Sequence, residues 1–302
     1  MEKLNRSNLF DILNGHVFNN AKSDLVSSVS DNPDRFIGIF RSTTPRLKLV
    51  QNILQSREIR FGDALEKVMQ QLFLEIGLVP LAKSFLSLEQ DKFSCDHYLV
   101  NEKTGIYYLI EQKMRDDHDS TKKRGQWNNF SGKINYLRHL HGSNIVGIMY
   151  FLDPTLVKNR NFYNINISIF QDAAKIPMFL FYNGELFDYL NHAELWVELT
   201  ENLALWRNSL GDSIDLDFDV NPLQSLEELR LVKLSSWEKL FSNDLLWRGG
   251  VIAAMFPQGS TLRLKRQQLL DSLTNASITG AEFKRVQRLL ITLDSRLEQY
   301  YV

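Results

Sequence analysis

Two short runs of strand-forming residues, separated by a turn, constrain the fold of this chain more than any other feature. The runs are SCDHYLV at 94–100 and IYYLIEQK at 106–113, and NEKTG between them supplies the Asn, Thr and Gly that favour a turn. They predict a two-stranded hairpin. Because side chains alternate along a strand, Glu111 and Lys113 share one face, and Asp96 lies at the start of the neighbouring strand. The hairpin therefore brings two carboxylates and one ammonium group together.

The segments around the hairpin predict a mixed sheet flanked by helices. Upstream, FGDALEKVMQQLFLEIG at 61–77 has apolar residues at helix spacing, and a second helix is expected after the polar run that follows the hairpin. Three further runs have strand character: 144–153, 164–170 and 175–184. From Gly184 onward the pattern is helical. This order predicts an α/β (α+β) fold with a mixed central β-sheet flanked by helices and a helical C-terminal region.

The chain of 302 residues divides by these patterns into three regions. They are an N-terminal helical region at 1–60, a core with the mixed sheet at 61–184, and a helical region at 185–302. The acidic run DSIDLDFDVNP at 212–222 is the expected linker.

Composition is that of an ordinary globular protein with a full core, because 44% of the residues are hydrophobic and 24% are charged. The single cysteine, Cys95, excludes an internal disulfide framework and fits a reducing cytoplasm. Charges interrupt the N-terminal segment, so we expect neither a signal peptide nor a membrane span. The net charge of −1 gives no global attraction to a polyanion, so nucleic-acid binding would depend on local basic stretches at 113–138 and 263–288.

Two carboxylates that converge from neighbouring strands can hold a hard cation such as magnesium through oxygen ligands. An ammonium group beside them can steady a phosphate or orient a water molecule. The Glu-x-Lys triplet alone is weak support, because Glu282-Phe283-Lys284 repeats it in a segment that reads as helix. Only Glu111 ends an apolar strand-like run and has an aspartate in the preceding strand. A solvated ion pair at the end of the strand is the alternative for Glu111 and Lys113.

Together, Asp96 and Glu111-Gln112-Lys113 resemble the catalytic motif of the PD-(D/E)XK nuclease superfamily, particularly type II restriction endonucleases. The resemblance covers about residues 62–150 and departs from the motif at Cys95, where the family often has proline. It implies catalytic roles for Asp96, Glu111, Lys113 and Glu66, the last from an upstream helix. It also implies a Mg²⁺ cofactor held by Asp96, Glu111, Gln112 and Glu66, with Gln112 offering its backbone carbonyl, and cleavage that leaves 5′-phosphate and 3′-hydroxyl ends.

The polar run after the catalytic strand, MRDDHDSTKKRGQWNNF at 114–130, is the expected DNA-reading segment. Its side chains include donors that suit guanine and acceptors that suit cytosine. The predicted DNA-binding residues are Arg115, Asp117, His118, Asp119, Ser120, Thr121, Lys122, Lys123, Arg124 and Gln126. The alternative is a solvated loop in which Asp116, Asp117 and Asp119 pair with the neighbouring basic residues.

A palindromic target in double-stranded DNA would require a homodimer. The helical region at 185–302 would supply the dimer interface, DNA contacts or both. The resemblance further implies a DNA methyltransferase acting on the same site, and a bacterial or archaeal cytoplasm. Two rival functions remain open: a structure-specific or repair nuclease of the same superfamily, and a non-catalytic nucleic-acid-binding module.

Overall fold

The computed structural model describes residues 4–38, 40–86, 92–211, 214, 216–274 and 280–301. The chain forms two compact units, one made of Met1–Val17 and Arg60–Leu210, the other of Phe18–Ile59 and Gly211–Val302. Each unit therefore joins segments that are distant in the sequence, and the long helix α3 (Pro45–Glu75) contributes residues to both. Within the described part of the chain, none of the helices combines the length and the apolar character of a membrane span.

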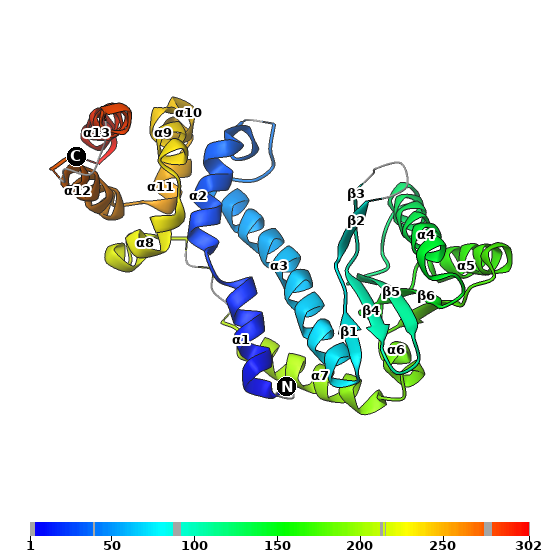
Figure 1. The fold of residues 1–302 in the computed structure, drawn as a ribbon. Coiled ribbons are helices and arrows are strands. Elements are labelled where there is room, and N and C mark those ends of the chain that lie inside the picture. The colour runs from blue at the N-terminus through cyan, green and yellow to red at the C-terminus, as the bar shows by residue number, and fades with distance from the viewer. Residues whose placement is uncertain are drawn as a thin grey trace. The chain divides into compact units, whose positions relative to one another are not determined.

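A five-stranded mixed sheet with the order β1-β4-β5-β6-β7 is the centre of the first unit (Figure 1). Its strands are β1 (Leu78–Pro80), β4 (His97–Asn101), β5 (Ile106–Lys113), β6 (Ile145–Phe151) and β7 (Met178–Tyr182). Strand β4 is antiparallel to both of its neighbours, β1 and β5, whereas β5, β6 and β7 are parallel. The predicted hairpin is confirmed, with His97 opposite Ile110 and Asn101 opposite Ile106. A separate two-stranded sheet pairs β2 (Ser84–Leu86) with β3 (Lys92–Ser94).

Strand β6 lies between two parallel neighbours, and every residue of its IVGIMYF sequence is buried. A continuous apolar run is what a parallel strand covered on both faces requires. Gly147 in this strand lies close to helix α4 (Ser120–His141), because a Cβ atom there would lie 2.8 Å from Cδ1 of Ile134 and that side chain would have to shift. Helix α4, which carries Ile134, therefore packs closely on the sheet.

Helices cover both faces of the sheet, which confirms the predicted fold class. On one face, α4 and α5 (Arg160–Ala174) enclose a core that includes Leu109, Met149, Phe130 and Tyr163. On the other face, Phe73 of α3 meets the ring of His97 edge-on at 5.1 Å and stacks on Phe187 of α6 (Glu185–Tyr189). Two further helices, α1 (Arg6–Val17) and α7 (Ala193–Asn208), complete the unit and pack against each other.

The prediction of a strand at 164–170 is wrong, because this segment lies inside helix α5. Its isoleucines alternate, but alternation in a helix places residues two apart on opposite sides. Ile167 is accordingly buried, whereas Ile165 and Ile169, which lie four residues apart on one face, are 60% and 64% exposed. The two-residue period was a coincidence of isoleucine placement rather than a signal of a strand.

In the described residues of the second unit, every regular element is a helix, in agreement with the predicted helical C-terminal region. Its elements are α2 (Ala21–Asp31), η1 (Pro33–Arg35), the first part of α3, α8 (Pro222–Glu228), η2 (Leu229–Leu231), α9 (Leu234–Ser242), α10 (Asp244–Arg248), α11 (Val251–Met255), α12 (Ser260–Thr274) and α13 (Gly280–Tyr300). Aromatic side chains fill its centre, with Trp237 and Phe241 of α9 fully buried.

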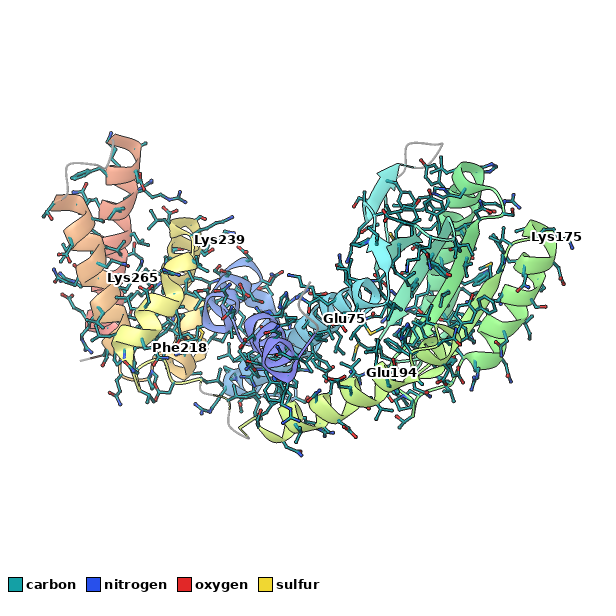
Figure 2. The ribbon with its side chains drawn as sticks, turned by 60° about the horizontal axis from the view of Figure 1, so that its bottom comes forward. Glu75, Lys175, Glu194, Phe218, Lys239 and Lys265 are labelled. Atoms are coloured by element: carbon teal, nitrogen blue, oxygen red, sulfur yellow. The ribbon has the colours of Figure 1, made fainter. Side chains whose placement is uncertain are left out.

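The expected linker at 212–222 is wrong for residues 216–219, while residues 212, 213 and 215 lie outside the described residues. Phe218, which is labelled in Figure 2, and Leu216 are buried in the core of the second unit. The ring of Phe218 meets that of Phe256 edge-on at 5.2 Å. The carboxylate of Asp219 accepts hydrogen bonds from the backbone N–H groups of Gln258 and Thr261, at the start of α12. Despite its acidic composition, the segment 216–219 is therefore an ordered part of the core.

Candidate active site

The hairpin places Asp96, Glu111 and Lys113 in contact at the end of strand β5. Nζ of Lys113 lies 2.9 Å from Oδ2 of Asp96 and 2.9 Å from Oε1 of Glu111. Asp96 precedes β4 directly, and its Oδ2 also accepts a hydrogen bond of 2.8 Å from the backbone N–H of Gln112. The antiparallel register therefore holds both carboxylates around one ammonium group.

A second lysine, Lys133 of α4, binds the other oxygen of Glu111. Its Nζ lies 2.8 Å from Oε2, and the side chains of Lys133 and Glu111 are only 4% and 9% exposed. In the sequence, Lys133 stands out only as one member of the basic stretch 113–138. The available signal was its position on the apolar stripe of the helix, three residues after Phe130 and four before Leu137, where a lysine needs a buried partner.

Lys113 remains a cation at neutral pH. Burial disfavours its charged form, but the carboxylates of Glu111 and Asp96 outweigh burial and raise its pKa above the ordinary lysine value. An ammonium group in this state can donate hydrogen bonds and stabilise negative charge. It does not serve as a general base, since it has no free lone pair.

Gln112 turns its side chain to the opposite face of the sheet. Its Oε1 lies 2.9 Å from Nε2 of His97, which donates the hydrogen bond when the neutral ring carries its proton there. Burial lowers the pKa of His97 to about 4, so this ring is neutral at physiological pH. Only the backbone of Gln112 is thus placed to take part at the carboxylate pair, and His97 has a structural position.

Glu66 of α3 forms an ion pair with Lys83, in the segment between β1 and β2. Burial raises the pKa of Glu66, Lys83 opposes that shift, and the charge of Asp96 adds to it. The carboxylate of Glu66 therefore contacts Lys83 directly, whereas Asp96 affects Glu66 only through its charge.

The carboxylates of Asp96 and Glu111 are hard oxygen donors that face a common point, which suits a magnesium ion. In the described part of the chain, no group of three or more His, Cys, Asp or Glu side chains is arranged to hold a metal ion. Two carboxylates thus fit such an ion, and further ligands would come from the backbone or from a moved Glu66.

Cys95 stands where the resembled motif often has proline. Its buried thiol donates to the carbonyl oxygen of Lys83, at 3.2 Å from sulfur to oxygen. Burial raises the pKa of this thiol to about 12, so it stays protonated and is not a nucleophile.

The polar run after β5 is an ordered turn and a helix start rather than a solvated loop. Helix α4 begins at Ser120, and the carboxylate of Asp119 caps it by accepting from the N–H groups of Thr121 and Lys122. The first amides of this helix are thereby satisfied within the protein.

Most of the predicted DNA-binding residues are on the surface of this segment. Those with exposed side chains are Arg115, Asp117, Asp119, Ser120, Thr121, Lys122 and Arg124. The others, His118, Lys123 and Gln126, are half-buried, and the last two contact the region of α5 through Asn159 and Tyr163. Asp116, which the alternative paired with neighbouring basic residues, is fully buried and bonded to Asn159 and Tyr182 instead.

Basic residues of the C-terminal tail are engaged within the second unit. Arg266 pairs with Asp294, Arg285 with Glu238, and Arg263 donates to the carbonyl oxygens of Gln258 and Tyr301. Lys265 is buried over the ring of Trp237. Much of the positive charge at 263–288 is therefore paired with groups of the protein itself.

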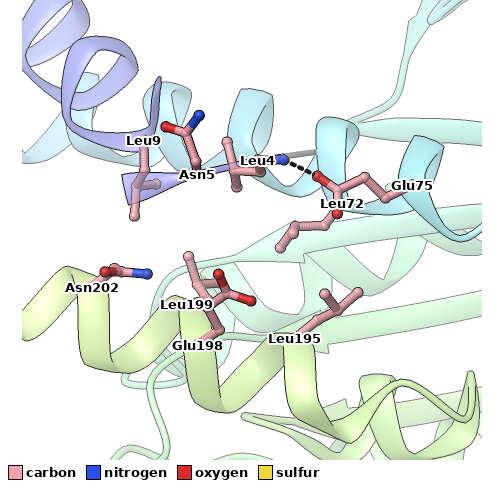
Figure 3. Close-up of a pocket in the computed structure, with 9 residues that line it drawn as sticks. All are labelled: Leu4, Asn5, Leu9, Leu72, Glu75, Leu195, Glu198, Leu199 and Asn202. Atoms are coloured by element: carbon pink, nitrogen blue, oxygen red, sulfur yellow. Dashed lines mark hydrogen bonds between the residues drawn. The ribbon is translucent and has the colours of Figure 1, made fainter. Parts of the chain in front are cut away.

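A small cavity elsewhere in the first unit is lined by α1, the two residues before it, α3 and α7 (Figure 3). Glu75 and Glu198 are its charged residues, and the backbone N–H of Leu4 donates to Glu75. None of the predicted site residues lines it. The cavity is therefore separate from the chemistry of the hairpin.

Part of the chain matches a known protein family. Residues 82–206 match the family model described as type II restriction endonuclease, HinfI. Neither curated proteins nor solved structures yield a significant match. The matched range contains Asp96, Glu111, Lys113 and Lys133, and it confirms the resemblance to type II restriction endonucleases.

Proposed function

We propose that this chain, which is similar over residues 82–206 to the HinfI family of type II restriction endonucleases, hydrolyses double-stranded DNA at specific sequences with Mg²⁺. The observation that carries the proposal is the convergence of Asp96 and Glu111 on Lys113, with 2.9 Å from each carboxylate to the ammonium nitrogen. Cleavage would leave 5′-phosphate and 3′-hydroxyl ends.

The proposed roles follow from the position of each group. Asp96 and Glu111 would hold the ion with the backbone carbonyl of Gln112, and Glu66 would contribute through water or after leaving Lys83. When bound, magnesium supplies Lewis acidity towards the phosphate oxygens. Lys113 would orient the attacking water or the scissile phosphate as a charged donor. Lys133 holds Oε2 of Glu111, so that Oε1 keeps its direction towards the site.

Sequence would be read mainly by the segment that follows the catalytic strand. Exposed Arg115, Lys122 and Arg124 carry positive charge for phosphates or guanine edges, and Asp117 offers an acceptor for cytosine. A palindromic target would need two copies of the chain, one for each strand. A methyltransferase of the same sequence specificity would protect the DNA of a bacterial or archaeal cell, in whose cytoplasm the enzyme would act.

The test is a digest of DNA of known sequence with and without Mg²⁺, followed by mapping of the ends. Glu111→Gln and Lys113→Ala should each abolish cleavage but retain DNA binding, measured by gel shift in the presence of a chelator. The triplet Glu282-Phe283-Lys284 in α13 supplies the matched control, because Glu282→Gln changes the same residue pattern outside the site. Full cleavage by Glu111→Gln or Lys113→Ala would refute the assignment.

The same digest separates the rival functions. Discrete fragments with one end sequence indicate a restriction enzyme, whereas cleavage that depends on junctions or damage indicates a repair nuclease. Binding without cleavage of any duplex, with every divalent ion tried, would favour a non-catalytic module.

A further inference from the structure

Asp116, three residues after Lys113, is a fully buried carboxylate that the proposed chemistry does not use. Its Oδ2 accepts from the backbone N–H of Asn159 at 2.7 Å and from the hydroxyl of Tyr182 at 2.8 Å. Its Oδ1 accepts from Nδ2 of Asn159 at 2.8 Å. Burying a charge is costly unless hydrogen bonds compensate, so these three bonds make the position of Asp116 specific.

Asp116 and its two partners follow or end three neighbouring parallel strands. Asp116 follows β5, Asn159 follows β6 and precedes α5, and Tyr182 is the last residue of β7. The backbone of Asp116 also pairs with Val157 and accepts from the N–H of Lys158 at 3.1 Å. One side chain therefore joins the segment after β5 to the segment before α5 and to the last residue of β7, at the carboxyl edge of the parallel strands. This is the edge where open α/β sheets bind their ligands.

The network continues from Asp116 to two predicted DNA-binding residues. Nδ2 of Asn159 donates to Asp116 and also to the carbonyl oxygen of His118, at 3.1 Å. Oδ1 of Asn159 accepts from Nζ of Lys123, at 3.0 Å. Both ends of the amide have partners that fit one orientation only, because Asp116 offers acceptors and Lys123 offers donors. Asp116 thus fixes Asn159, and Asn159 fixes Lys123 and the backbone at His118.

We propose that Asp116 is a positioning residue for sequence recognition: it holds the segment 114–124 against Asn159, at the start of α5, and Tyr182, at the end of β7, and so sets the DNA-facing groups. This inference rests on the proposed function and assigns to the buried carboxylate a part in binding and discrimination, separate from bond cleavage. Lys113 and Glu111 keep their own contacts to Asp96 and Lys133, so the reacting groups do not depend on the network.

The test compares Asp116→Asn, Tyr182→Phe and the control Asp172→Asn, which removes an exposed carboxylate from α5. The wild-type enzyme first defines its cleavage site, and each variant is then assayed on a duplex with that site and on duplexes with one base pair changed. Asp116→Asn should raise KM about 10-fold or more and lower the ratio of cognate to altered-site cleavage, because hydrogen bonds to a charged group are lost. Its kcat should change less than about 3-fold.

Tyr182→Phe removes one hydroxyl and leaves the carboxylate, so it should raise KM and reduce discrimination by a smaller factor. It decides the question if Asp116→Asn fails to fold, which circular dichroism would reveal. Wild-type KM and discrimination in a folded Asp116→Asn, or in Tyr182→Phe when only that variant folds, would overturn the inference. So would a loss confined to kcat. Absence of cleavage by the wild-type protein refutes the proposed function instead, which keeps the two failures distinct.

Discussion

Replacing Lys133 with methionine should destabilise the first unit strongly, although it removes no apolar group. Nζ of Lys133 lies 2.8 Å from Oε2 of Glu111, and both side chains are more than nine-tenths buried. Removing one member of a buried ion pair commonly costs about 3–5 kcal/mol, because the remaining charge is uncompensated. Lys113 still contacts Oε1 of Glu111, so we expect a loss at or below the lower end, about 2–3 kcal/mol. Methionine retains most of the lysine volume, so a cavity adds little.

Equilibrium urea unfolding at pH 7 measures this loss, and a double-mutant cycle identifies its cause. Glu111→Gln removes the charge that Lys133 compensates. The double variant Lys133→Met/Glu111→Gln should therefore lose about 2 kcal/mol less free energy of unfolding than the two single variants lose together. Lys122→Met, an exposed lysine of the same helix, should stay within about 0.5 kcal/mol of wild type. Additive losses in the cycle, or a Lys133→Met protein as stable as wild type, would refute the reasoning.

Other variants test the remaining structural conclusions. Because burial lowers the pKa of His97 to about 4, the unfolded chain takes up a proton below about pH 6.5 that the folded chain does not, and stability falls as pH is lowered through this window, by up to about 3 kcal/mol. His97→Phe should flatten that fall in urea midpoints measured from pH 7 to 4.5; an unchanged slope would contradict it. Phe218→Ala should cost about 3–5 kcal/mol, whereas an unchanged thermal midpoint would restore the linker interpretation. Asp119→Ala should speed hydrogen exchange at the amides of Thr121 and Lys122, and equal exchange in Asp119→Ala and wild type would exclude the cap.

The features that the sequence predicts correctly are local ones. The hairpin depends on residues within twenty positions of one another, so composition and alternation suffice to place Asp96 beside Glu111 and Lys113. Strand β6 is also predictable from local sequence, because a continuous apolar run between turns is typical of a buried parallel strand. The error at 164–170 has the opposite origin: Ile165, Ile167 and Ile169 carry a strand pattern, but packing against the sheet made the segment a helix with two exposed isoleucines.

The contacts that the sequence could not supply join distant positions. Lys133 reaches Glu111 from 22 residues away, and Tyr182 reaches Asp116 from 66 away. No periodicity encodes which acidic residue a buried lysine meets. The segment at 216–219 shows the same limit. From the sequence, Asp219 is expected to be a solvated charge, but its carboxylate accepts hydrogen bonds from backbone amides about forty residues away. Charge patterns alone therefore misjudge residues whose partners are backbone amides.

The charges at the carboxylate pair imply that Lys113 must move when a divalent ion binds. Two carboxylates face two ammonium groups there, so an added ion of charge +2 would meet an already neutralised site. The side chain of Lys133 is only 4% exposed, whereas that of Lys113 is 24% exposed, so Lys113 is the lysine that would leave the carboxylates. Lys113→Met should therefore bind Mg²⁺ more tightly than wild type in the absence of DNA, although the proposed function predicts no cleavage by this variant. Isothermal titration measures this directly. Weaker or equal binding by Lys113→Met would show that Lys113 does not compete for the carboxylate oxygens and acts only on the substrate.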